Sequence, residues 1–317
     1  MDSTEPETLR HEQLAFSTGI TLPQGQDFLT PVIQARAPFF EALVSWNARV
    51  PKSAGMSVEL RVRETEQYEW SPWLFVGEWG AVPEERERTI EFGGGRIDVD
   101  YFAGSDEFGE LQLRFDVYGR GTVELSRFDL CLTGAGPMRE HKAGAERGYV
   151  SLEVPPRSQR TEEASLADRV CSPTTVAMML EYRGVSVPTS VVAEKLYDVR
   201  HDIYGNWTRA IQGAFEFGVP GYLTRFSDWE SVEAVLRSGQ PLVASIRTPE
   251  GGLTGAPYVS TAGHLVVIVG FDEAGNLLVN DPAASSAEEV RLLYPRAEME
   301  RAWMGKGGLA YVFLQPE

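Results

Sequence analysis

The hydrophobic pattern of the chain changes its period near residue 147, and this change restricts the possible fold more than any other feature. Before that point, apolar and polar residues alternate in short segments that Gly and Pro separate. The clearest segments are residues 39–46, 57–63, 97–102, 111–115 and 123–132. A period of two with one polar face is typical of antiparallel strands, and several in a row favour a sandwich or jelly roll. Residues 1–147 are therefore predicted to be an all-β sandwich, jelly-roll-like, that serves as an ancillary domain and ends in a linker.

The second half of the chain has a different order of elements. Helices are expected over residues 172–183, 189–197, 208–217 and 228–237, and strands over 242–246, 264–271, 277–279 and 309–314. Helices followed by antiparallel strands indicate an α+β domain, predicted here as residues 148–317. A segment rich in Gly and charge, residues 133–144, marks the linker. The full length of 317 residues is enough for two domains that each bury a core.

Charge and hydropathy exclude several classes of partner. The formal net charge is −17, which argues against nucleic acid and against an anionic membrane surface. No apolar run has the length of a membrane span. The first five residues, Met-Asp-Ser-Thr-Glu, are acidic where a signal peptide would be basic and then apolar. A cytoplasmic location is expected, or export if a leader precedes this sequence.

The chain has two cysteines, too few for a disulfide framework. Cys131 lies in an alternating strand pattern and is expected to be a buried free thiol. The four histidines are scattered, and no Cys or His pair has the spacing of metal ligands. We therefore expect no metal and no cofactor.

Cys171 is expected at the N-terminus of a helix. Ser172 is a suitable N-cap, Pro173 suits the first helical position, and Gly184 ends the periodic segment. Unpaired N–H groups and the helix dipole at this position stabilise a thiolate, lowering the cysteine pKa from about 8.5. The alternative for any single cysteine is a buried structural thiol.

His264 and Asp281 are expected to meet across a hairpin. His264 begins a continuous apolar strand, and residues 272–275 form a turn before a returning strand. If Phe271 pairs with Asn276, Asp281 lies diagonal to His264 on the same face, and Asn280 points away. The alternatives are a core histidine at a strand end and a turn-forming aspartate before a proline.

Acyl transfer also needs donors for a developing oxyanion. Gln159 precedes Cys171 by twelve positions and could bring its amide beside the Cys171 backbone N–H. Taken alone, a glutamine in a loop carries no functional information.

Several short motifs of the second half resemble the papain-like cysteine peptidases, in the branch of the bacteriocin-processing, double-glycine-leader peptidases. The resemblance covers about residues 148–317. The matching segments are Val154-Pro155 with Gln159, Cys171-Ser172-Pro173-Thr174-Thr175 with Ala177-Met178, Tyr204-Gly205-Asn206-Trp207, Gly239-Gln240-Pro241-Leu242-Val243, Gly263-His264-Leu265 with Val269-Gly270-Phe271, and Val279-Asn280-Asp281-Pro282.

This resemblance implies a papain-like α+β fold whose cleft lies between the nucleophile helix and the sheet. It also implies Cys171 as nucleophile, His264 as general base and acid, Asp281 as the residue that orients His264, and Gln159 as oxyanion donor. Ser172 stands where Gly commonly follows the nucleophile, which changes the adjacent subsite. Residues 251–261 could rim the cleft, with Trp207 as another wall; Ser172 and Trp207 are thus candidate substrate-binding residues.

Three functions remain open from the sequence. The leading hypothesis is a cysteine peptidase that hydrolyses peptide bonds through a Cys171 acyl-enzyme. The second is an acyl transferase, like transpeptidases or transglutaminases, that passes the same acyl group to an amine or thiol. The third is an inactive papain-like binding module.

The N-terminal domain has its own candidate ligand. Its aromatic segment from Trp70 to Trp79 could stack a carbohydrate or cell-wall ligand, although packing in the core or at the sheet edge is the favoured interpretation.

Overall fold

The structure is a computed structural model that describes residues 9–316 except 65–66, 84, 86 and 137–147. Contacts within the chain divide it into two compact units, Met1–Arg139 and Glu140–Glu317. The predicted boundary between residues 147 and 148 stays a prediction, because residues 137–147 of the expected linker lie outside the described residues. Each unit is described by itself.

Every regular element described in the N-terminal unit is a strand. The strands are β1 (Leu9–Pro23), β2 (Asp27–Leu29), β3 (Ile33–Arg49), β4 (Ala54–Glu64), β5 (Leu74–Gly80), β6 (Glu91–Phe92), β7 (Gly95–Asp98), β8 (Tyr101–Gly119) and β9 (Thr122–Ala135). The all-β prediction is confirmed for this region. Hydrogen bonds join all nine into a single sheet with the main order β1-β9-β3-β8-β4-β5, and every pairing is antiparallel.

The long strand β8 holds this sheet together because it changes partners along its length. Its first part pairs with β7 and β3, and its later part pairs with β4 and with the short β2. Register shifts interrupt the β3–β8 and β4–β8 ladders, and such irregularities bend a strand. Strand β8 therefore links β7 and β3 to β4 and β2 within the sheet.

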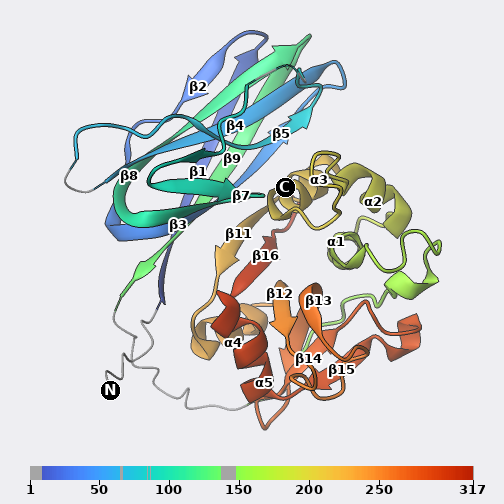
Figure 1. Ribbon diagram of the computed structural model, residues 1–317. Coiled ribbons are helices and arrows are strands. Elements are labelled where there is room, and N and C mark those ends of the chain that lie inside the picture. The colour runs from blue at the N-terminus through green and yellow to red at the C-terminus, as the bar shows by residue number, and fades with distance from the viewer. Residues whose placement is uncertain (1–8, 65–66, 84, 86, 137–147, 317) are drawn as a thin grey trace, which may run out of the picture. The chain divides into compact units, whose positions relative to one another are not determined.

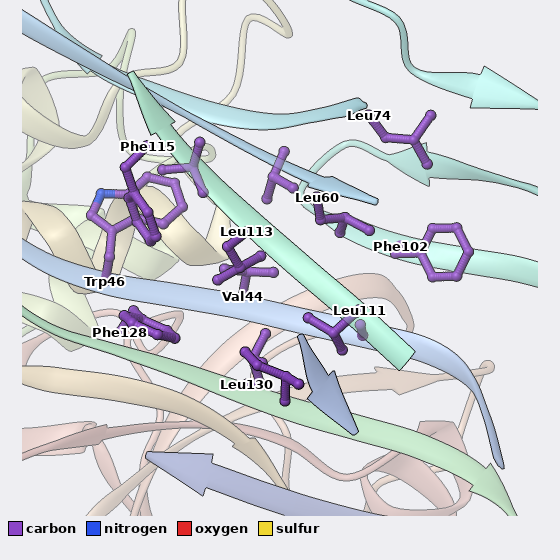
Figure 2. Close-up of a cluster of buried hydrophobic side chains, with 14 of the residues drawn as sticks. Val44, Trp46, Leu60, Leu74, Phe102, Leu111, Leu113, Phe115, Phe128 and Leu130 are labelled. Carbon is purple, nitrogen blue, oxygen red and sulfur yellow. The ribbon is translucent and has the colours of Figure 1, made fainter. Parts of the chain in front are cut away.

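The core of this unit follows the predicted period of two. Along residues 42–48 of β3, 54–62 of β4 and 111–117 of β8, every second residue is buried and apolar, and these side chains form one cluster. Figure 2 shows Val44 and Trp46 from β3 facing Leu113 and Phe115 from β8. The rings of Phe115 and Phe128 pack with centroids 5.6 Å apart. The single sheet thus encloses an aromatic and aliphatic interior.

The aromatic segment after β4 stacks against arginines of the sheet. The guanidinium carbon of Arg61 lies 4.6 Å from the ring centroids of both Trp70 and Trp73. Arg63 lies 4.7 Å from Trp70, and Arg114 lies 4.7 Å from Trp73. The arginines also bond Gln112, Glu110 and Glu59. We call this stack of two indoles and three guanidinium groups the Trp–Arg ladder; it covers both indoles with intramolecular contacts.

The C-terminal unit combines helices with a second sheet. Its helices are α1 (Cys171–Tyr182), α2 (Thr189–Leu196), α3 (Trp207–Glu216), α4 (Trp229–Arg237) and α5 (Arg296–Ala302), with short 3₁₀ turns at Gln159–Thr161, Ala287–Glu289 and Met304–Lys306. Its strands are β10 (Val150–Ser151), β11 (Gly221–Arg225), β12 (Leu242–Thr248), β13 (Thr261–Phe271), β14 (Leu277–Asn280), β15 (Arg291–Tyr294) and β16 (Leu309–Phe313). The four predicted helices and four predicted strands are present, whereas β10, β11, β15 and α5 were not predicted.

All pairings in the second sheet are antiparallel, in the order β11-β16-β12-β13-β14-β15, with β10 on β13. Helices α4 and α5 pack on one face, because Leu236 and Met299 share a core cluster with Ala244 and Val266 of β12 and β13. In Figure 1, α1, α2 and α3 gather on the other side of β12 and β13. In the described parts of the chain, no helix combines the length and apolar character needed to cross a bilayer.

Candidate active site

Helix α1 presents Cys171 as its first residue. The N-cap is Val170, whose side chain makes no capping bond, so the prediction that Ser172 caps this helix is wrong. The Val170 carbonyl accepts the backbone N–H of Thr174 at 2.9 Å and its hydroxyl at 2.7 Å, so the helix begins two residues earlier than predicted. Cys171 is partly exposed and free, and its thiol is at the positive end of the helix.

The side chain of Ser172 turns into the protein rather than toward a substrate. It is fully buried, and its hydroxyl lies 3.4 Å from that of Tyr311 on β16. The sequence-based expectation that the Ser172 side chain shapes a neighbouring subsite is therefore not supported by its position. Its backbone N–H remains at the helix N-terminus beside the thiol.

The hairpin that carries His264 and Asp281 turns one residue later than predicted. Phe271 pairs with Leu277, and not with Asn276. The Asp272 N–H donates to the Asn276 carbonyl at 2.9 Å, and the Asp272 carboxylate accepts the Asn276 N–H at 2.8 Å. These bonds draw Asn276 into the turn, where it faces Asp272.

A β-bulge then restores the predicted register nearer to His264. Val269 lies between Ile268 and Gly270 without a paired residue on β14, so the register of β13 against β14 shifts by one residue. Beyond the bulge Val267 pairs with Asn280, which is the pairing that the predicted register requires. The later turn and the unpredicted bulge shift the register in opposite directions, so Asp281 lies on the predicted face of the hairpin.

His264 and Asp281 meet in the interior. The Nε2 atom of His264 lies 2.7 Å from Oδ1 of Asp281. His264 is 6% exposed and Asp281 0%, so the pair is shielded from bulk water. Asn280 instead donates to the carbonyl of Val154 at 3.1 Å. The contact predicted for Asp281, and not for Asn280, is thus confirmed.

Two tyrosines that the sequence did not single out bind the same carboxylate. The hydroxyl of Tyr258 donates to Oδ2 of Asp281 at 3.0 Å, and that of Tyr294 donates at 2.7 Å. The backbone N–H of Ala283 donates to Oδ1 at 2.9 Å. No motif marks these tyrosines, because one lies in a loop before β13 and the other at the end of an unpredicted strand.

The charges of the site favour an ion pair. Burial would raise the pKa of Cys171, but a hydrogen bond and the charge of His264, with the N–H groups of Leu265 and Ser172, lower it. Burial would lower the pKa of His264, but the charge and hydrogen bond of Asp281 raise it to about 10. Burial opposes ionisation of Asp281 too, yet the His264 charge and the donors around it keep its pKa below the ordinary value. The lowered pKa of the thiol and the raised pKa of the imidazole both favour the thiolate–imidazolium pair over the neutral pair.

Gln159 lies on the segment that precedes helix α1. Its backbone N–H donates to Pro282 O at 2.8 Å, next to Asp281, and its Nε2 donates to Ala167 O at 2.7 Å. The side chain is 3% exposed, and its Oε1 finds no hydrogen-bond partner among the described residues. The amide of Gln159 thus bonds the carbonyl of Ala167, and its role as oxyanion donor stays a prediction.

Trp207 and the segment of residues 251–261 are the remaining predicted features. Trp207 is the first residue of α3 and is partly exposed. The N-cap of this helix is Asn206, whose side chain accepts the N–H of Arg209 at 3.0 Å. The segment contributes Tyr258 to the site and leaves Val259 68% exposed. Trp207 as a cleft wall stays a prediction.

The second cysteine of the chain is Cys131 on β9. It is buried and forms no disulfide, as predicted. Within the residues that the structure describes, no group of three or more His, Cys, Asp and Glu side chains is arranged to hold a metal ion.

Two protein-family models match the chain. The model described as the Peptidase_C39 like family matches residues 151–311, and the one described as the Peptidase C39 N-terminal domain matches residues 23–128. The first match contains all of the site residues described above. A search of curated protein sequences gives no match.

Three solved peptidase structures each align with about half of this chain. A putative C39-like peptidase from Bacillus anthracis is 22% identical, covers 53% of this chain and is itself covered to 98%, with a TM-score of 0.42. A double glycine motif protease from an AMS/PCAT transporter, in complex with its leader peptide, is 20% identical, with coverages of 54% and 96% and a TM-score of 0.35. The peptidase domain of Streptococcus ComA is 12% identical, with coverages of 51% and 99% and a TM-score of 0.37.

Proposed function

The chain belongs to the Peptidase_C39 like family, and from this premise we propose that its C-terminal unit hydrolyses peptide bonds with Cys171 as the nucleophile. One observation carries the proposal: Cys171 begins a helix, its thiol pKa is lowered by His264, and Nε2 of His264 is bound to the buried carboxylate of Asp281. An inert structural cysteine needs none of these arrangements.

In the proposed reaction, the Cys171 thiolate attacks the carbonyl carbon of the substrate amide, and the carbonyl oxygen becomes an oxyanion. His264 donates its proton from the nitrogen that faces Cys171 to the leaving amine, so that the C–N bond breaks and an acyl-enzyme remains. Neutral His264 then takes a proton from water, whose oxygen attacks the thioester. Collapse of this second tetrahedral intermediate releases the acid and restores the thiolate and the imidazolium.

The oxyanion requires donors near Cys171. We assign this role to the backbone N–H of Cys171 and to the second amide N–H of Gln159. The fixed position of Gln159 supports the assignment, since its backbone is tied to Pro282 and its side chain to Ala167. Donors held in place before the reaction stabilise a developing charge without reorganisation.

The proposal includes the finer features of the two units. In the C-terminal unit, a papain-like arrangement would place the substrate between the α1 N-terminus and the sheet that carries His264, with Trp207 as a side wall. In the N-terminal unit, an ancillary sandwich-like domain would recruit large substrates. Its Trp–Arg ladder weighs against a carbohydrate stacked on Trp70 or Trp73, because guanidinium groups already cover these rings.

Two alternatives use the same site differently. An acyl transferase would pass the acyl group to an amine or thiol instead of water, and product analysis with and without an added amine separates it from a peptidase. An inactive binding module would need no activated thiolate, and the lowered pKa of Cys171 beside buried His264 weighs against it.

The decisive experiment is labelling of the full chain with an iodoacetamide-type probe at pH 6, followed by mapping of the modified cysteine. We expect modification of Cys171, while buried Cys131 stays unmodified and serves as the internal control. In His264→Ala the imidazolium is lost, so the alkylation midpoint of Cys171 should rise toward the free value of about 8.5. A wild-type midpoint already near that value, unaffected by His264→Ala, would leave the binding module as the better explanation.

A further inference from the structure

The carboxylate of Asp281 is the most heavily bonded group in the site. It is 0% exposed and accepts four hydrogen bonds. Oδ1 receives His264 Nε2 and the Ala283 N–H, and Oδ2 receives the hydroxyls of Tyr258 and Tyr294. A buried carboxylate is costly unless its lone pairs are satisfied, and here two phenols share one oxygen.

From this geometry we propose that Tyr258 and Tyr294 are positioning residues that keep Asp281 ionised and aim its other oxygen at His264. The inference rests on the proposed function, because it concerns how that site activates Cys171. Neither tyrosine is proposed to touch the substrate.

The two phenols reach the carboxylate from different parts of the fold. Tyr294 is fully buried at the end of β15, the strand that pairs with β14 just before Asp281. Tyr258 comes from the loop before β13, and its ring also meets the His264 ring edge to face, with centroids 5.0 Å apart. Together they prevent the carboxylate from rotating, because Oδ2 is held from two directions while Oδ1 faces the imidazole.

The loop that presents Tyr258 is itself tied down. The Gly251 N–H donates to the Val259 carbonyl at 3.1 Å, which closes the loop at its base. Thr254 donates its N–H and its hydroxyl to the carboxylate of Glu298 on α5, at 2.6 and 3.0 Å. Tyr258 is therefore held by the fold before any substrate arrives, as a positioning residue must be.

No cation other than His264 is seen to bond this carboxylate in the part of the chain that the structure describes. Arg160 donates to the carbonyl of Ala283 at 3.5 Å, and Arg291 donates to the side chain of Asn280 at 2.7 Å. The charge of His264 also lowers the pKa of Cys171. Burial and the charge of Asp281 raise the pKa of both phenols, so each remains a neutral donor throughout the working pH range.

The test compares the pH dependence of Cys171 alkylation in the full chain with that of Tyr258→Phe, Tyr294→Phe and Tyr182→Phe. Phenylalanine keeps each ring and removes only the hydroxyl. Tyr182 is the matched control, since its hydroxyl donates to the Gly239 carbonyl at 2.9 Å, at the other end of α1. Thermal unfolding of each variant establishes that it is folded at the temperature of the assay.

We expect the alkylation midpoint of Cys171 to move upward by up to about one pH unit in Tyr258→Phe and in Tyr294→Phe, because each loses a hydrogen bond to a charged group. A less well stabilised Asp281 carboxylate supports the imidazolium less, and the imidazolium in turn stabilises the thiolate. The shift should be smaller than that of His264→Ala, and Tyr182→Phe should match the wild type.

The outcomes separate this inference from the function on which it rests. If His264→Ala raises the midpoint but both tyrosine variants coincide with the wild type, the phenols only pack and the inference is overturned while the peptidase proposal stands. The inference is equally overturned if Tyr182→Phe shifts the midpoint as much as they do. If the wild-type midpoint is that of a free thiol and ignores His264→Ala, the proposed function itself fails.

Discussion

Gln159 shows how much of the site depends on the surroundings of a single residue. As a loop residue it would be expected to contribute little to folding, yet its side chain is 3% exposed and its amide donates to the carbonyl of Ala167. The same amide therefore serves stability through one N–H and, in the proposed mechanism, catalysis through the other.

These two roles make different predictions for Gln159→Ala. Loss of the bond to Ala167 should lower the free energy of unfolding by about 1–3 kcal/mol. Loss of an oxyanion donor should lower kcat on a peptide substrate by about 10²-fold. The alkylation midpoint of Cys171 should not change, since the pKa of the thiol is set by His264 and backbone N–H groups. Gln67→Ala, at an exposed glutamine of the N-terminal unit, is the control. Unchanged turnover in Gln159→Ala would remove this residue from the mechanism.

At the scale of elements, the β13–β14 hairpin decides which side chain meets His264. The bulge at Val269 is followed by Gly270, and a Cβ at Gly270 would lie 1.9 Å from the carbonyl oxygen of Val150 on β10. Only a residue without a side chain allows β10 to approach the strand at this point. The register of the hairpin thus depends on close contact with a third strand.

Gly270→Ala should therefore destabilise the C-terminal unit and disturb the site at a distance. The added methyl group has to push β10 away or shift the bulge, so we expect the thermal midpoint to fall by several degrees. A shifted bulge would also misplace Asp281, raising the alkylation midpoint of Cys171. Gly205→Ala is the matched control, because a Cβ at Gly205 meets nothing within 4 Å. Equal thermal midpoints for the two variants would contradict this account.

The hairpin also shows how far sequence patterns reach. The apolar run from Leu265 onward and the turn at Asp272 are local signals, and they predicted both strands; the face of Asp281 came out right only because the later turn and the bulge cancel. The bulge was not predictable, since it depends on packing against β10, which is only two residues long. Tyr258 and Tyr294 were missed for the same reason: their contacts with Asp281 span 23 and 13 positions and leave no periodic trace.

The helix that begins with Cys171 was also predicted only in part. Its position and its end at Gly184, which has a φ of 85°, followed from local preferences. Its N-cap did not, because burial of Ser172 beside Tyr311 depends on a strand near the other end of the chain.

For the whole molecule, the division into two units predicts that the C-terminal unit folds without the N-terminal unit. All residues assigned to the proposed chemistry lie between positions 159 and 281, and both positioning tyrosines are in the same unit. A chain that starts at Gly148 should be monodisperse, show cooperative unfolding, and keep the low alkylation midpoint of Cys171. If the N-terminal unit recruits large substrates, this shorter chain should lose efficiency on them while keeping its activity on short peptides. Precipitation, or loss of the reactive thiol, would mean that the two halves share a core.

The carboxylate with its two phenols also has a consequence for biosynthesis. Cys171 leaves the ribosome long before His264, Asp281 and Tyr294 exist, and β16, which lies between β11 and β12, is made later still. Until those segments have emerged, the α1 N-terminus has no imidazolium beside it, and Cys171 is an ordinary thiol. On the proposed assignment, the nucleophile would therefore become reactive only after the last strands have been made and have closed the sheet.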